Sequence, residues 1–152
     1  MNNDSRRRFL IAAAAGVLAT QVRIAAAVPK IEVLEPLVQK ITGGAPLADG
    51  RVTLDIPSLS DNGHSVPLKI TVASAMSERD HVRAIHVLSE KNPRPMIATF
   101  HLNPRCGRAE ITTRVRLNGE QRILVIAALS DGSFHAASAS VLVTETACLD
   151  AT

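Results

Sequence analysis

The sequence predicts an all-β protein, an immunoglobulin-like antiparallel β-sandwich with one short N-terminal helix and a flexible C-terminal arm. Two observations lead to this fold class. Beyond residue 44, apolar and polar residues alternate, which is the period of strands with one buried and one solvent-facing side. Turn signals rich in Gly, Pro, Asn and Asp separate these short segments at regular intervals, as is typical of sandwiches.

Residues 1–27 are expected to be a twin-arginine signal peptide rather than part of the fold. Arg6 and Arg7, followed by Arg8, precede an apolar run that begins at Phe9, the pattern of this export signal. The run is shorter than the roughly 20 residues that span a bilayer. Ala25 and Ala27 supply the small-residue cleavage pattern. We therefore expect a folded protein in the periplasm with no membrane contact after cleavage; an uncut anchor is the alternative.

The charge of the chain comes from this leader. The full sequence has 17 basic and 14 acidic residues. The leader holds four of the basic and one of the acidic residues, so 13 of each remain in the mature part. A neutral domain has no electrostatic footprint for nucleic acid or anionic lipid, so neither is expected as a partner.

Residues 28–44 are expected to form a helix and a linker. Apolar side chains recur there at helical spacing, which predicts a helix from Glu32 to Ile41. The pair Gly43-Gly44 is expected to end it. The apolar positions are Val33, Leu34, Leu37, Val38 and Ile41.

Residues 45–145 are expected to fold into the sandwich, and residues 146–152 to form the arm. The segment 123–129 is continuously apolar, which is typical of a central strand covered on both faces. Asn118-Gly119 is a strong hairpin signal and is expected to join this strand to the previous one. Asp131-Gly132 is expected to turn the chain into the last strand. The predicted strands are 52–54, 66–72, 82–89, 96–102, 111–117, 123–129 and 136–144.

No motif of a common enzyme class is present. The sequence lacks a Gly-rich phosphate loop, a nucleophile elbow and an HExxH motif, so no cofactor and no catalytic residue are predicted. The histidines show no zinc-site spacing and are interpreted as scattered surface or half-buried side chains, with a metalloenzyme as a lesser hypothesis. They are His64, His81, His86, His101 and His135.

Cys148 is the candidate functional residue because it lies just past the last strand, near the end of the chain. Chain ends are usually mobile, so a thiol there can reach into the active site of another protein. With an ordinary pKa of about 8.5, a few per cent of such a thiol is ionised at pH 7. Alternatively, Cys148 is bonded to Cys106 or inert. Cys106 itself is expected to be a small, half-buried side chain.

Several short segments from Ile41 onward form a pattern that is specific only in combination. They are Ile41–Gly44, Asp55–Pro57, Asn62-Gly63, Ser65–Pro67, Asp80–Val82, Glu90–Pro93, Ala98–Leu102, Pro104–Leu117 and Ser130–Phe134. In these segments the chain resembles the SoxY family, the sulfur-carrier subunits of the periplasmic thiosulfate-oxidising Sox complex. The twin-arginine leader fits this family as well.

The resemblance implies an immunoglobulin-like sandwich in a heterodimer with a leaderless SoxZ-like subunit. It also implies a carrier rather than an enzyme. A cysteine on the arm, at the position of Cys148, would hold the sulfur compound covalently. The arm would be presented in turn to a haem enzyme that attaches thiosulfate, a manganese hydrolase that releases sulfate, and a sulfane dehydrogenase.

The arm departs from the family pattern, which ends in Gly-Gly-Cys-Gly-Gly. Here Thr146, Ala147, Leu149 and Asp150 replace the four glycines. Glycine enters narrow channels and adopts positive φ at little steric cost, whereas a nearby negative charge raises the pKa of a thiol. Two interpretations follow: a variant carrier whose partners have wider clefts, or a binding subunit that keeps the fold and the heterodimer surface without carrier activity. The first is preferred.

Overall fold

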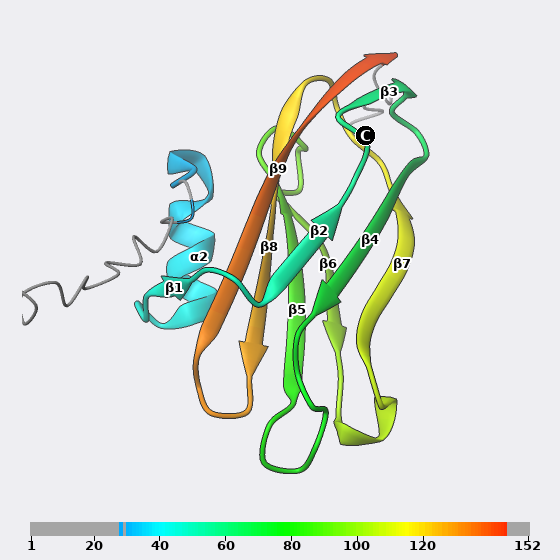
Figure 1. Cartoon of the computed structure of the whole chain (residues 1–152). Helices are drawn as coiled ribbons and strands as arrows, with labels where there is room; N and C mark the ends of the chain where they lie inside the picture. Colours follow the sequence, from blue (N-terminus) through cyan, green and yellow to red (C-terminus); the bar gives the residue numbers. More distant parts are fainter. Residues whose placement is uncertain (1–27, 29, 146–152) are drawn as a thin grey trace, which may run out of the picture.

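Two facing β-sheets enclose an aliphatic core (Figure 1). The computed structural model describes residue 28 and residues 30–145. The larger sheet has the order β1-β9-β8-β5-β6, with β3 also paired to β9. Its strands are β1 (Leu47–Ala48), β3 (Leu59–Asn62), β5 (Val82–Ser89), β6 (Met96–His101), β8 (Gln121–Leu129) and β9 (Phe134–Glu145). The smaller sheet contains β2 (Val52–Asp55), β4 (Val66–Val72) and β7 (Ala109–Val115). The predicted sandwich is confirmed.

Strand β8 is the central strand that its apolar run predicted. Every residue from 123 to 129 is buried. Alternate side chains such as Val125 and Ala127 face the core between the sheets. Leu124 and Ile126 face the other way, toward the helix. Because both sides are covered, neither needs polar residues, and the alternation disappears.

The N-terminal helix covers the outer face of the larger sheet. It comprises a short 3-10 turn, η1 (Glu32–Leu34), and the α-helix α2 (Glu35–Thr42), with a proline in the first turn of α2. Proline fits a first turn because its missing N–H has no helical partner there. The helix ends at Gly43, whose φ of 64° is left-handed. No helix among the described residues has the length and apolarity to cross a bilayer.

Two features of the sheets differ from the prediction. Strands β1 and β3 were not predicted, and both pair with β9 in parallel rather than antiparallel. They comprise two and four residues, and each contains one large apolar residue, Leu47 or Leu59, so no apolar alternation marks them. Strand β2, which lies between them in the sequence, belongs to the smaller sheet. Residues 47–62 therefore contribute two short strands, β1 and β3, that pair with β9.

The predicted hairpin at Asn118-Gly119 is wrong. Strand β7 pairs with β4 in the smaller sheet, whereas β8 pairs with β5 and β9 in the larger one. Gly119 has a φ of 67°, but the turn carries the chain between sheets. Leu117 is fully buried just before it and would leave the core if the strands paired directly. The turn at Asp131-Gly132 does form the expected hairpin between β8 and β9.

An ion pair between Arg122 and Glu90 stabilises the loop after β5. The Arg122 side chain donates from Nε to Glu90 Oε2 and from Nη2 to Glu90 Oε1, both at 3.2 Å. The Arg122 backbone N–H donates to the same carboxylate at 3.2 Å. These hydrogen bonds lower the pKa of Glu90 below its ordinary value of 4.5.

Glu90→Gln is therefore expected to lower the Tm at pH 7. A lowered pKa gives stability that is present above pH 4.5 and is lost as the pH falls through the folded-state value. The gap in Tm between wild type and variant should close over that window in thermal unfolding experiments. Glu110→Gln, which breaks a more exposed pair with Lys69, is the control and should lower the Tm less. A difference in Tm between wild type and Glu90→Gln that does not change with pH would contradict the lowered pKa of Glu90.

Candidate functional site at the base of the arm

The predicted carrier residue Cys148 lies outside the described residues, so the site is described from the strand that leads to it. Strand β9 ends at Glu145, three residues earlier. The Gly63 N–H donates to the Glu145 carbonyl at 2.8 Å, and the Gly63 carbonyl accepts from the Leu117 N–H at 2.8 Å. Leu117 follows β7 of the smaller sheet. Gly63 thus ties the end of β9 to both sheets.

Strand β3 fixes the same end of β9 from its edge. The Leu142 N–H donates to the Ser58 carbonyl at 2.8 Å, and the Thr144 hydroxyl donates to the Asp61 carbonyl at 3.3 Å. The Asn62 side chain accepts from the His64 N–H at 2.8 Å, an Asx turn that presents Gly63 to β9. Sequence reasoning missed β3, although the Asn62-Gly63 turn signal marked its end.

Chain length confines the Cys148 thiol to this end of the sandwich. Three residues extend at most about 11 Å, so the Cα of Cys148 stays within that distance of Glu145. Cys106 lies in the turn η2 (Pro104–Cys106), before β7 and at the opposite end of the molecule (Figure 1).

The described strands place the two cysteines too far apart for a bridge within one chain. Strand β7 pairs with β4 from Ala109 to Val115, and six residue steps of a strand span about 20 Å. A disulfide requires Cα atoms within about 7 Å. With β9 paired as far as Glu145, the intrachain bridge is out of reach. Cys106 is also exposed, not half-buried as predicted.

The five histidines are spread over the described chain, although His86 and His101 lie near each other on the paired strands β5 and β6. His86 Nδ1 lies 3.1 Å from the Thr99 hydroxyl, and burial, with a smaller contribution from His101, lowers the pKa of His86. Within the described residues, no three His, Cys, Asp or Glu side chains lie close enough to hold a metal ion. The other positions are a turn for His64, the residue before β5 for His81, the end of β6 for His101 and the start of β9 for His135.

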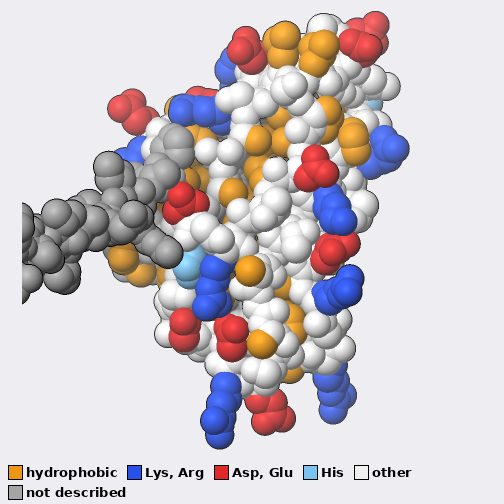
Figure 2. All heavy atoms as spheres, in the orientation of Figure 1, with side chains coloured by type: hydrophobic (Ala, Val, Ile, Leu, Met, Phe, Trp, Pro, Cys, Tyr) orange, Lys and Arg blue, Asp and Glu red, His pale blue; other side chains and the backbone are white. Residues whose placement is uncertain are grey.

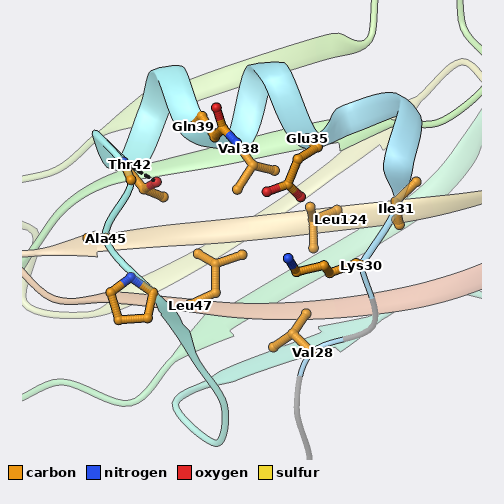
Figure 3. A pocket seen from close by; sticks show the side chains of 12 residues that line it. Val28, Lys30, Ile31, Glu35, Val38, Gln39, Thr42, Ala45, Leu47 and Leu124 are labelled. Carbon is orange, nitrogen blue, oxygen red and sulfur yellow. Dashed lines mark hydrogen bonds between the residues drawn. The ribbon is translucent and has the colours of Figure 1, made fainter.

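A pocket of about 410 Å³, which the sequence did not predict, lies beside α2. In Figure 3, Val38 from α2, Leu47 from β1 and Leu124 from β8 point toward one another, and Lys30 and Glu35 add opposite charges. Strand β1 pairs with the first residues of β9. The pocket therefore lies away from the arm: its lining residue Leu124 pairs with Ser138, about 23 Å of strand before Glu145, so the pocket is not part of the same site.

Comparison with solved structures identifies the same sandwich in other proteins. The sulfur carrier protein SoxY from Chlorobium limicola f thiosulfatophilum aligns with a TM-score of 0.62 and 22% identity, covering 74% of this chain and 97% of that one. A superoxide reductase (neelaredoxin) from Ignicoccus hospitalis aligns with a TM-score of 0.56 and 13% identity, covering 62% and 80%. At these identities the likeness shows the fold alone.

Comparison of the sequence with family models is more specific than the structural comparison. A comparison with curated proteins gave no match. The family model described as sulfur oxidation protein SoxY matches residues 38–148, most of the chain, and its last matched residue is Cys148. The chain belongs to the SoxY family, the sulfur carriers of sulfur oxidation.

Proposed function

We propose that this protein carries thiosulfate-derived sulfur covalently on Cys148 and presents it to partner enzymes in the periplasm. The observation that carries the proposal is the family match, which extends into the arm and ends at this cysteine. The fixed end of β9 supports it, because Glu145 is held by Gly63 and the thiol follows only three residues later. The end of β9 at Glu145 is therefore fixed, and the Cys148 thiol lies beyond it in the sequence.

Loading is an oxidation that the carrier cannot perform alone. The Cys148 thiol loses its proton, and its sulfur bonds to the sulfane sulfur of thiosulfate, giving Cys–S–S–SO3⁻. Two electrons leave in this step and are accepted by a haem enzyme. Water then breaks the S–SO3 bond at a manganese hydrolase, which releases sulfate and leaves a persulfide on the cysteine. A sulfane dehydrogenase then accepts the electrons as the outer sulfur of the persulfide is oxidised. The carrier supplies the nucleophile, whose thiolate form reacts.

Export and pairing complete the proposal. Arg6 and Arg7 direct the precursor to the twin-arginine pathway, and cleavage follows Ala27. That pathway accepts folded cargo, so a leaderless SoxZ-like subunit crosses together with this chain as a heterodimer. Both residues of the export motif lie outside the described residues, and the sequence pattern alone supports this step.

A second candidate function is a non-catalytic scaffold subunit that retains the heterodimer surface but no carrier activity. The arm favours it, since Thr146, Ala147, Leu149 and Asp150 stand in place of four glycines. The version in which Cys106 blocks Cys148 is disfavoured, because the bridge is out of reach within one chain. The choice depends on whether partner enzymes accept the bulkier arm.

Mass spectrometry separates the two functions. The mature protein with its partner subunit is incubated with thiosulfate and the haem enzyme, and we expect a mass increase of one S2O3 group on the Cys148 peptide. The matched control restores glycine at positions 146, 147, 149 and 150. If the glycine variant loads and the wild type does not, the chain is a scaffold. If neither loads, this haem enzyme does not recognise the sandwich and carrier function fails with it.

A further inference from the structure

Two histidines lie near each other on the outer face of the larger sheet. His86 on β5 pairs with Thr99 on β6, and His101 lies two residues after Thr99 on the same strand. Side chains two residues apart on a strand project from the same face, so His86, Thr99 and His101 share one face. This face is not the core face, because the adjacent residues Ile85 and Phe100 pack into the core between the sheets.

The two imidazole rings are within reach of a single ion. His86 and His101 are diagonal neighbours on paired antiparallel strands, and the Cα atoms of such neighbours lie about 7–8 Å apart, a gap that long side chains bridge. Burial and, more weakly, the charge of His101 lower the pKa of His86. Two nitrogens bound to one ion, each at about 2.0–2.1 Å, lie about 3 Å apart. Rotation of the exposed His101 side chain about its own bonds can bring its ring to that distance.

Thr99 holds the ring of His86 in the form that binds a metal. The Thr99 hydroxyl donates to Met96 Sδ at 3.6 Å, so its oxygen is left to accept from His86 Nδ1 at 3.1 Å. A neutral imidazole with its proton on Nδ1 has its lone pair on Nε2. Metal-binding histidines commonly donate their other ring N–H to such a partner, which fixes both the tautomer and the orientation of the ring. Nε2 of His86 is therefore set up as a ligand before any ion arrives.

The histidine pair is open to solution on the β6 side. His86 is half-buried, because on its other side it pairs with Ile126, which packs against the N-terminal helix. Thr99 and His101 are exposed. Strand β6 is the end strand of the larger sheet, so no further strand of the described chain lies beside it in that sheet. An ion can therefore reach the two rings from solvent without a change of the fold.

We propose that His86 and His101 bind one divalent transition-metal ion of the class that prefers imidazole, and that Cu²⁺ binds most tightly. Water completes the coordination, because within the described residues no third His, Cys, Asp or Glu joins the pair. Imidazole nitrogen suits Cu²⁺, Ni²⁺ and Zn²⁺, whereas Mg²⁺ and Ca²⁺ require oxygen ligands. Acidic side chains are interspersed with basic ones on the face shown in Figure 2, so that face offers no competing carboxylate cluster among the described residues. The site goes beyond the carrier function, because no step of sulfur loading uses it.

Calorimetric titration with Cu²⁺ tests the site. The mature chain carries Cys106→Ser and Cys148→Ser, so that no thiol competes, and is titrated at about pH 7.5, above the ordinary histidine pKa. One ion should bind per chain. His86→Ala and His101→Ala should each weaken binding about 100-fold or more, because a single imidazole lacks the advantage of two linked ligands. Thr99→Val keeps both rings but removes the hydroxyl that orients one of them, and should weaken binding about tenfold.

His64→Ala is the matched control, because it removes an exposed imidazole from a turn elsewhere in the chain, and it should leave the affinity unchanged. Affinity equal to that of the parent chain in His101→Ala would overturn the proposal. This variant decides even if His86→Ala does not fold, since His101 is exposed. Tighter binding of Zn²⁺ than of Cu²⁺ would also contradict it, because a simple nitrogen site follows the opposite order. Sulfur loading is not measured, so the metal site and the carrier function fail independently.

Discussion

Cys148→Ser is expected to abolish sulfur loading entirely, with no mass increase after incubation with thiosulfate and the haem enzyme. A serine hydroxyl neither ionises at neutral pH nor forms the sulfur–sulfur bond that holds the cargo. The fold should be unaffected, because the substitution lies three residues past the last described residue of β9. Equal Tm values for wild type and variant would establish that the loss is chemical.

Cys106→Ser is the matched control. Cys106 is exposed at the opposite end of the sandwich, so its substitution should leave loading intact. If instead Cys106→Ser abolished loading while Cys148→Ser retained it, the carrier residue would be the cysteine in η2 and the arm would lose its assigned role. Loading in both single variants would mean that either thiol is modified without selectivity.

Gln121→Leu is expected to destabilise the protein by about 3 kcal/mol, because it leaves several buried polar groups without partners. Gln121 is 3% exposed and Ser89 is fully buried. The Gln121 Oε1 accepts from the Ser89 hydroxyl at 2.6 Å and from the Lys91 N–H at 3.1 Å. Its Nε2 donates to Asn92 Oδ1 at 3.1 Å. Leucine is close in size but offers none of these contacts.

Urea unfolding measures this effect as a lower midpoint at an unchanged slope. Gln39→Leu is the control: Gln39 is exposed on α2, so the same replacement should change stability by at most about 0.5 kcal/mol. Similar midpoints for the two variants would contradict the role assigned to the network. The network also explains the motif Glu90–Pro93, because Asn92 donates to the Arg116 carbonyl at 2.8 Å and so joins the β5–β6 loop to the chain between the sheets.

Long elements were predictable because their patterns repeat. The alternation in β4 is visible over seven residues, and its burial alternates in the same way. The apolar run of β8 predicted burial on both sides, and Gly43 marked the end of the helix. In each case one local signal is enough, since a periodic pattern fixes both the element and its buried face.

The parts of the fold that the sequence did not predict depend on contacts between residues that are distant in the sequence. Strands β1 and β3 exist because they pair with β9, at least 80 residues later. Asn118-Gly119 has the composition of a hairpin turn, but the burial of Leu117 directs the chain across the core instead. For the site, the sequence pointed to Cys148, whereas the tie through Gly63 that fixes the base of the arm required the structure.

If Cys148 carries the cargo as proposed, the hydrogen bonds of Gly63 limit which enzymes can act on that cargo. Since the backbone is fixed at Glu145, the Cα of Cys148 can extend at most about 11 Å from the sandwich into the active site of a partner enzyme. A reaction centre recessed more deeply would be served only if β3 peeled away from β9. The hydrogen bond to the Glu145 carbonyl thus limits how deeply the arm can enter a partner enzyme, and it favours partner enzymes with shallow reaction centres.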